Sequence, residues 1–167
     1  MSPNRKLSGL PDVMFRIQRG LAGYVSYLAA CEMNQAFSEY VLYEPILRIL
    51  IARGYEVECE SVCPGIQQPK TGDKKKLDFV ASNDKVNFAL EVKWARTRNP
   101  RLRMDLEKLE GFREAHPGNR SFLCVFGRKS VLRHIELVDD HFTERGEAVY
   151  AEFKTTRYGC RIYEVRI

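Results

Sequence analysis

The chain has 167 residues, of which 44% are hydrophobic and 29% are charged, and its formal net charge is +5. This length and composition predict one domain with a hydrophobic core, and they exclude a disordered, collagen-like or repeat protein. The basic excess permits a polyanionic partner, whereas the longest uncharged run, 12 residues over 20–31, is too short for a membrane-spanning helix of ~20 residues.

The first third of the chain predicts two helices. Residues 1–11 hold two prolines and no apolar period, so we expect a loose tail there. Apolar residues then recur at helical spacing over 13–34, which predicts an amphipathic helix. A second helix is expected over 38–54, between a serine N-cap and a glycine C-cap. Because Pro45 is tolerated only in a first turn, the continuous part of this helix is expected to begin near Glu44.

The remainder of the chain reads as strands interrupted by helices. Strands are expected over 55–59, 77–81, 86–94, 121–126, 149–153 and 161–165. Helices are expected over 102–115 and 129–137, and a loop over 61–76. This order predicts an α/β domain over 38–167, with a central mixed sheet flanked by helices, preceded by a tail and helical extension over 1–37.

The five cysteines have neither the spacing of a disulfide framework nor that of a zinc site. They are Cys31, Cys59, Cys63, Cys124 and Cys160. We therefore expect reduced cysteines in a cytoplasmic protein.

One predicted hairpin carries the candidate chemistry. Side chains alternate across a strand, so the following residues share one face, which we expect in the core: Phe88, Leu90, Val92 and Trp94. Glu91 and Lys93 then share the other face. If the hairpin closes around residues 84–85, Asp78 lies opposite Glu91.

Two opposed carboxylates repel each other unless a cation neutralises them. Mg²⁺ takes oxygen ligands, often one or two carboxylates, so Asp78, Glu91 and the Val92 carbonyl form a candidate site for Mg²⁺ or Mn²⁺. Lys93 beside this site would orient a water molecule or neutralise charge developing on a phosphate. The alternative is a solvated acid–base pair on the surface of a sheet.

Asp78 followed by Glu91-Val92-Lys93 resembles the signature of the PD-(D/E)XK, or restriction-endonuclease-like, nuclease superfamily. Leu77 stands where the family often has proline, a position at which the proline is frequently absent. Residues 39–46 and 54–57 are similar to the first helix and strand of that core, and residues 101–109 and 121–126 to its second helix and fourth strand.

The resemblance implies an αβββαβ core, dependence on Mg²⁺ and cleavage of phosphodiester bonds. It also implies that Asp78, Glu91 and Lys93 are catalytic, and that the protein acts as a homodimer. The first core helix of the family often adds an acidic residue. Glu39 on the apolar face fits this role better than Glu44, which reads as a first-turn acid.

Basic residues flank the proposed site on both sides. The candidates for binding nucleic acid are Lys74, Lys75, Lys76, Arg96, Arg98, Arg101 and Arg103. Clustered cations beside a carboxylate pair favour a nucleic-acid partner, for which we expect DNA. The alternatives are a module of the same fold that binds nucleic acid without cutting it, and a protein-interaction domain.

Overall fold

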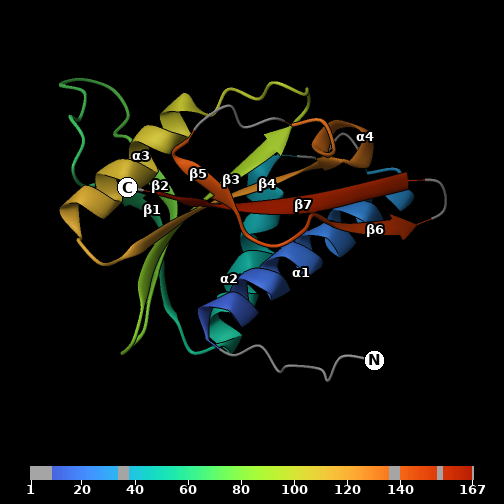
Figure 1. The fold of residues 1–167 in the computed structure, drawn as a ribbon, viewed down its shortest axis with the longest axis horizontal. Helices are drawn as coiled ribbons and strands as arrows, with labels where there is room; N and C mark the ends of the chain where they lie inside the picture. The colour runs from blue at the N-terminus through green and yellow to red at the C-terminus, as the bar shows by residue number, and fades with distance from the viewer. Residues whose placement is uncertain (1–8, 34–37, 136–139, 154–155, 167) are drawn as a thin grey trace.

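The computed structural model describes residues 9–33, 38–135, 140–153 and 156–166 (Figure 1). They form one mixed sheet of seven strands with helices on both faces. The strands are β1 (Glu56–Val62), β2 (Lys76–Ser82), β3 (Asn87–Ala95), β4 (Arg120–Arg128), β5 (Phe142–Glu144), β6 (Val149–Phe153) and β7 (Thr156–Val165). The helices are α1 (Leu10–Ala30), the 3₁₀ helix η2 (Glu39–Leu42), α2 (Tyr43–Ala52), α3 (Arg103–Ala115) and α4 (Lys129–Leu132).

The strand order is β1-β2-β3-β4-β7-β5, and β6 also pairs with β7. The first three strands form an antiparallel meander. α3 then crosses over so that β4 runs parallel to β3, while β7 returns antiparallel to β4. The described chain from α2 to β4 therefore runs helix, three strands, helix, strand, and the predicted mixed sheet is confirmed.

Each face of the sheet has its own hydrophobic core. α1 and α2 cover one face, where their apolar residues pack with Phe79, Leu90 and Phe126. α3 and α4 cover the other face, where the core includes Leu77 and Leu123 (Figure 1). β4 lies between the two cores, so its burial is nearly continuous, as expected of a strand covered on both faces.

Most predicted elements are present with shifted ends. α1 begins at Leu10, inside the predicted tail, because Pro11 is tolerated in a first helical turn. The described part of α1 ends at Ala30, and the predicted end at residue 34 lies outside the described residues. Gly54 has φ of +80°, as predicted for a residue that ends a helix.

Two predictions in the second half of the chain need correction, and one strand there was not predicted. The predicted helix over 129–137 is a single turn that ends at Leu132, and residues 136–137 lie outside the described part. β5 has only three residues and gives too short a pattern to be predicted. β7 begins at Thr156, five residues before the predicted strand. None of the described helices combines the length and the apolar character needed to cross a membrane.

Candidate functional site

The hairpin of β2 and β3 sets the register of the two predicted acids. Phe79 pairs with Leu90 and Ser82 with Asn87, so the next position brings Asp78 opposite Glu91. The Asp78 amide donates to Glu91 Oε1 at 3.1 Å, and the Val92 amide donates to Asp78 Oδ2 at 2.7 Å. Each carboxylate thus accepts a hydrogen bond from an amide of the opposite strand, one position beyond the Phe79–Leu90 pair that ends the β2–β3 ladder.

The strands are distorted at this level. Leu77 packs in the core under α3, whereas Phe79 packs in the core under α1 and α2. In β1, Glu60 lies between the residues paired with Phe79 and Leu77, and its φ is +55°. A φ in this region is uncommon for a residue other than glycine, so it marks local strain. The distortion lies beside the acid pair.

Tyr43 of α2 joins two of the acids. Its hydroxyl lies 2.6 Å from Asp78 Oδ1 and 2.8 Å from Glu60 Oε1. A tyrosine hydroxyl carries one proton and donates to one acceptor at a time. Burial, followed by the hydrogen bond to Asp78, raises the pKa of Tyr43, so the hydroxyl stays protonated. Tyr43 therefore positions the Asp78 carboxylate from the α2 side of the sheet.

Glu91 is buried and Asp78 is half-buried, so negative charge on this pair is costly. Glu91 is only 1% exposed. Burial, and then the charge of Asp78, raises the pKa of Glu91 to about 8. Burial also raises the pKa of Asp78, against the opposing effect of its hydrogen bonds from Tyr43 and Val92. The two groups therefore favour a cation nearby.

A lysine from α3 contacts the pair directly. Lys108 Nζ lies 2.5 Å from Glu91 Oε2 and donates to the carbonyl of Lys76 at 3.0 Å. Burial lowers the pKa of Lys108, but the charges of Glu91 and Asp105 raise it above its ordinary value. Lys108 therefore stays charged, and this ammonium group neutralises Glu91.

The predicted lysine, Lys93, lies beside the pair with different partners. Lys93 Nζ is 3.3 Å from Asp105 Oδ2 and 3.9 Å from Glu39 Oε1. Glu39 Oε1 also accepts the Trp94 amide at 3.0 Å, which ties η2 to β3. The structure thus brings Glu39 and Lys93 together at the edge of the acid pair.

Glu44, the alternative acid, lies elsewhere. It pairs with Arg48 on the exposed side of α2, and its side chain is 61% exposed.

Trp94, expected in the core, is only half-buried. Its ring stacks on Phe126 with 6.0 Å between centroids, and Arg96 covers the ring at 4.4 Å. This position at the margin of the core is a correction to the prediction.

Sequence reasoning missed four residues of this site: Tyr43, Glu60, Asp105 and Lys108. Asp105 and Lys108 are three positions apart on the flank of the apolar stripe of α3, a spacing that places them on one face. This signal was present in the sequence. Glu60 and Tyr43 reach the site through the register of β1 and the packing of α2, which a single sequence does not reveal.

A groove lined by cations opens beside the acid pair. Its volume is about 580 Å³, and its lining includes six basic residues: Lys75, Lys76, Lys93, Arg101, Arg103 and Lys108. Four of the predicted nucleic-acid-binding residues are among them, whereas Lys74, Arg96 and Arg98 are exposed outside this lining. The one acid in the lining is Asp105. The groove therefore suits a polyanion.

The side chains of the site include few metal ligands. Among the described residues, no group of three or more His, Cys, Asp or Glu side chains is arranged to hold a metal. Mg²⁺, however, is often bound through one or two carboxylates, with water completing its shell. Asp78 and Glu91 supply two opposed carboxylates, and burial raises the pKa of both, so a further cation such as Mg²⁺ or Mn²⁺ would favour their ionised forms. The Val92 carbonyl remains a predicted ligand, because Val92 contacts Asp78 through its amide and not through its carbonyl.

Comparison with models of protein families, with curated proteins and with solved structures finds no match to this chain. The function is therefore argued from the geometry of the site.

Proposed function

We propose that this chain is a metal-dependent nuclease that hydrolyses phosphodiester bonds in DNA and has a PD-(D/E)XK-type core. The observation that carries the proposal is the opposed Asp78–Glu91 pair, with Glu91 buried, beside a groove lined by six cations. The helix, three strands, helix, strand order of α2 to β4 supports it, because the resemblance in the sequence implies this order.

The cations of the groove would hold the phosphates. Lys75 and Lys76 lie on the β2 side, and Arg101 and Arg103 precede or begin α3. A strand of nucleic acid between them would present a phosphate to Lys93 and Lys108, which line the same groove. Asp105 and Glu39 hold Lys93 in place, and Lys93 would neutralise charge that develops on the phosphate.

Asp78 and Glu91 would hold Mg²⁺ or Mn²⁺, which lowers the pKa of a bound water and withdraws charge from a phosphate oxygen. Tyr43 orients the Asp78 carboxylate through its hydroxyl. Lys108 holds the Glu91 carboxylate from the α3 side. The two acids are therefore preorganised by residues of both helical layers, which limits the reorganisation that the reaction requires.

One observation favours a second candidate, a module that binds nucleic acid without cutting it. All four carboxylate oxygens of the pair already accept a protein donor: the Asp78 amide and Lys108 for Glu91, and the Tyr43 hydroxyl and Val92 amide for Asp78. Such a pair is stable without a metal. Each oxygen has a second lone pair, so these bonds leave room for a metal ligand.

The test is cleavage by purified protein. Supercoiled plasmid, single-stranded DNA, branched DNA and RNA would be incubated with Mg²⁺, Mn²⁺ or EDTA. Glu91→Gln and Lys93→Met proteins would be compared with wild type, and Glu44→Gln would serve as the control because Glu44 lies on the exposed side of α2. We expect metal-dependent cutting by wild type and Glu44→Gln only.

Salt-sensitive binding without cutting on any of these substrates would favour the second candidate. Absence of both binding and cutting would contradict both. Two further proposals are a homodimer, which the same preparation tests, and a reducing, cytoplasmic location. Light scattering gives the mass of the particle. All five cysteines are free in the structure, as a reducing compartment would keep them.

A further inference from the structure

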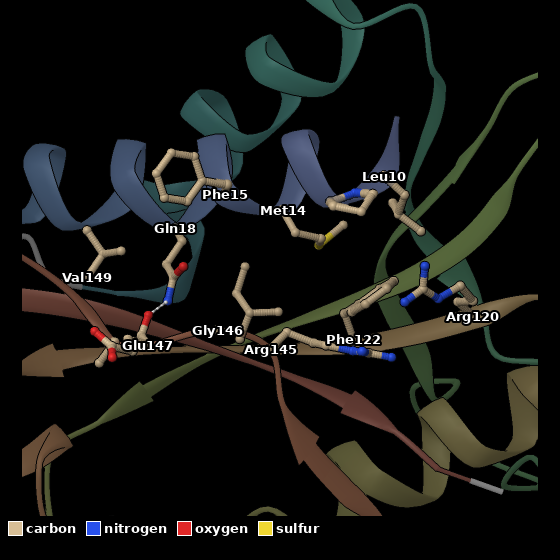
Figure 2. A pocket seen from close by; sticks show the side chains of 13 residues that line it. Leu10, Met14, Phe15, Gln18, Arg120, Phe122, Arg145, Gly146, Glu147 and Val149 are labelled. Carbon is tan, nitrogen blue, oxygen red and sulfur yellow. Dashed lines mark hydrogen bonds between the residues drawn. The ribbon is translucent and has the colours of Figure 1, made fainter. Parts of the chain in front are cut away.

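A second cavity lies on the opposite face of the sheet from the cationic groove. It occupies about 570 Å³ between α1, the strands β4 and β7, and the loop that precedes β6 (Figure 2). This volume falls within the range of small-molecule sites. None of its lining residues lines the groove beside the acid pair, so it is separate from the site described above.

The cavity is held in shape by bonds on both sides of the loop that borders it. Gln18 of α1 is 4% exposed and donates to the carbonyls of Glu147 and Cys160, each at 2.9 Å. The Arg145 amide donates to the Ile162 carbonyl at 2.8 Å. The loop is therefore tied to α1 and to β7, and the space between them is part of the fold.

Most of the lining is apolar. Met14 and Phe15 contribute from α1, Phe122 and Ile162 from the sheet, and Val149 from β6. Phe15 is 39% exposed, so the cavity reaches solvent along this helix. Such a lining favours a ligand with an apolar body.

One end of the cavity is cationic. Figure 2 shows the guanidinium groups of Arg120 and Arg145 together at the end beside Leu10 and Phe122, with Gln18 and Val149 at the other end. Both arginines pair with Glu164, so this end carries two positive charges against one negative charge. Arg120 uses two of its five N–H groups on that carboxylate, at 2.5 and 2.8 Å, so donors remain for an anion.

Other charges favour the same orientation. The N-terminus of α1, at Leu10, lies at the cationic end, and a helix N-terminus carries partial positive charge. The Glu147 carboxylate lies at the opposite end, beyond Gln18 (Figure 2). An anionic group is therefore attracted to the arginines and kept from the far end.

We propose that this cavity binds a small organic carboxylate, with its anionic group on Arg120 and Arg145 and its apolar body along Met14 and Phe15. The bidentate geometry of arginine suits a carboxylate. The excess positive charge at one end favours an anionic group on the ligand, and the apolar lining favours an apolar chain in the rest of it. The proposal does not depend on nuclease activity.

Three probes that share one chain test it: decanoate, decanol and decylammonium. Binding would be measured by calorimetry below the concentrations at which the probes aggregate. We expect decanoate to bind wild type about tenfold or more tightly than either of the others, as one lost charge-assisted hydrogen bond predicts. Amide resonances of Gln18, Gly146 and Val149 should shift in the NMR spectrum, because these residues line the cavity.

Three variants localise the binding. Arg145→Met should weaken decanoate binding about tenfold and leave decanol unchanged. Ala148→Trp should abolish binding of all three probes, because Ala148 lines the cavity and the larger indole side chain would occupy that space. Ala115→Trp, exposed at the end of α3, should bind like wild type.

Several results would overturn the proposal. Equal affinity of wild type for decanoate and decanol would remove the role of the arginines. Shifts confined to the groove beside α3, unchanged binding by a folded Ala148→Trp protein, or no binding of decanoate by wild type would remove the site. The comparison among probes uses wild type alone, so it stands even where a variant fails to fold.

Discussion

Replacing Arg101 by alanine should reduce the salt dependence of DNA binding by about one contact. Six cations line the groove, but Lys93 and Lys108 are held by acids of the site. The other four are available for phosphates: Lys75, Lys76, Arg101 and Arg103. Arg103 pairs with Glu107, and Lys76 lies 4.0 Å from Glu60. Their side chains are 90% and 43% exposed, so both pairs are weak and exchange easily.

The magnitude follows from counterion release. Each phosphate contact on duplex DNA contributes about 0.9 to the slope of log Kd against log salt concentration, so four contacts predict a slope of about 3.6. Between about 50 and 200 mM KCl, the Kd of wild type should rise about 150-fold. With three contacts left in Arg101→Ala, the slope should be about 2.7 and the rise about 40-fold.

The assay is fluorescence anisotropy of a labelled duplex, titrated at several KCl concentrations in EDTA so that no cutting occurs. Arg48→Ala is the matched control, since Arg48 is 81% exposed on α2, on the opposite face of the sheet. It should keep the wild-type slope. A wild-type slope for Arg101→Ala, or an equal loss for Arg48→Ala, would refute binding in the groove.

Three further predictions concern the free energy of unfolding, measured by urea denaturation. Burial opposes ionisation of Glu164, but Arg120 and Arg145 hold its pKa below the ordinary value of 4.5. The ion pairs therefore stabilise the fold above that pH, and this stabilisation is lost as the pH falls through the lowered pKa of the folded state. Glu164→Gln should therefore cost about 1.5–3 kcal/mol at pH 7. The cost should shrink as the pH is lowered below 4.5, and a cost that does not change with pH would contradict a charge effect. Above about pH 8, where Glu91 is ionised, Lys108→Met should cost about 3–5 kcal/mol by leaving the buried Glu91 carboxylate without its cation. Lys93→Met, whose side chain is 27% exposed, should cost less at the same pH, and a reversed order would contradict this assignment. Gly111→Ala should lower the free energy of unfolding, although alanine has a helix propensity about 1 kcal/mol better than glycine. The reason is that the new Cβ would lie 2.9 Å from the Pro64 carbonyl oxygen and 2.5 Å from Ile66 Cγ2. A more stable variant would contradict this close approach.

The local sequence pattern of the β2–β3 hairpin was sufficient to predict that Asp78 and Glu91 lie opposite each other. The alternation over 86–94 and the turn before it set the register, and the register brings Asp78 opposite Glu91. The order of strands and helices up to β4 follows from the same kind of local signal, because each element there is long enough to show its period.

Long-range packing explains what was not predicted. Lys108 reaches Glu91 because α3 crosses the sheet at a particular position, and this depends on the loop before β2 resting on Gly111. Arg120 comes from β4, Arg145 from the loop before β6, and Glu164 from β7. Their spacing in the sequence does not predict that the three side chains are in contact. The second cavity is built by these long-range contacts, so the sequence pattern does not predict it either.

The acid pair also has a consequence for reading related sequences. Asp78 and Glu91 accept the amides that β2 and β3 would otherwise leave unpaired where their backbone pairing ends. A descendant that had lost all activity would still need these acceptors to keep its hairpin closed. The presence of both acids in a relative is thus weak proof of chemistry, and the lysines and the groove are the better diagnostic.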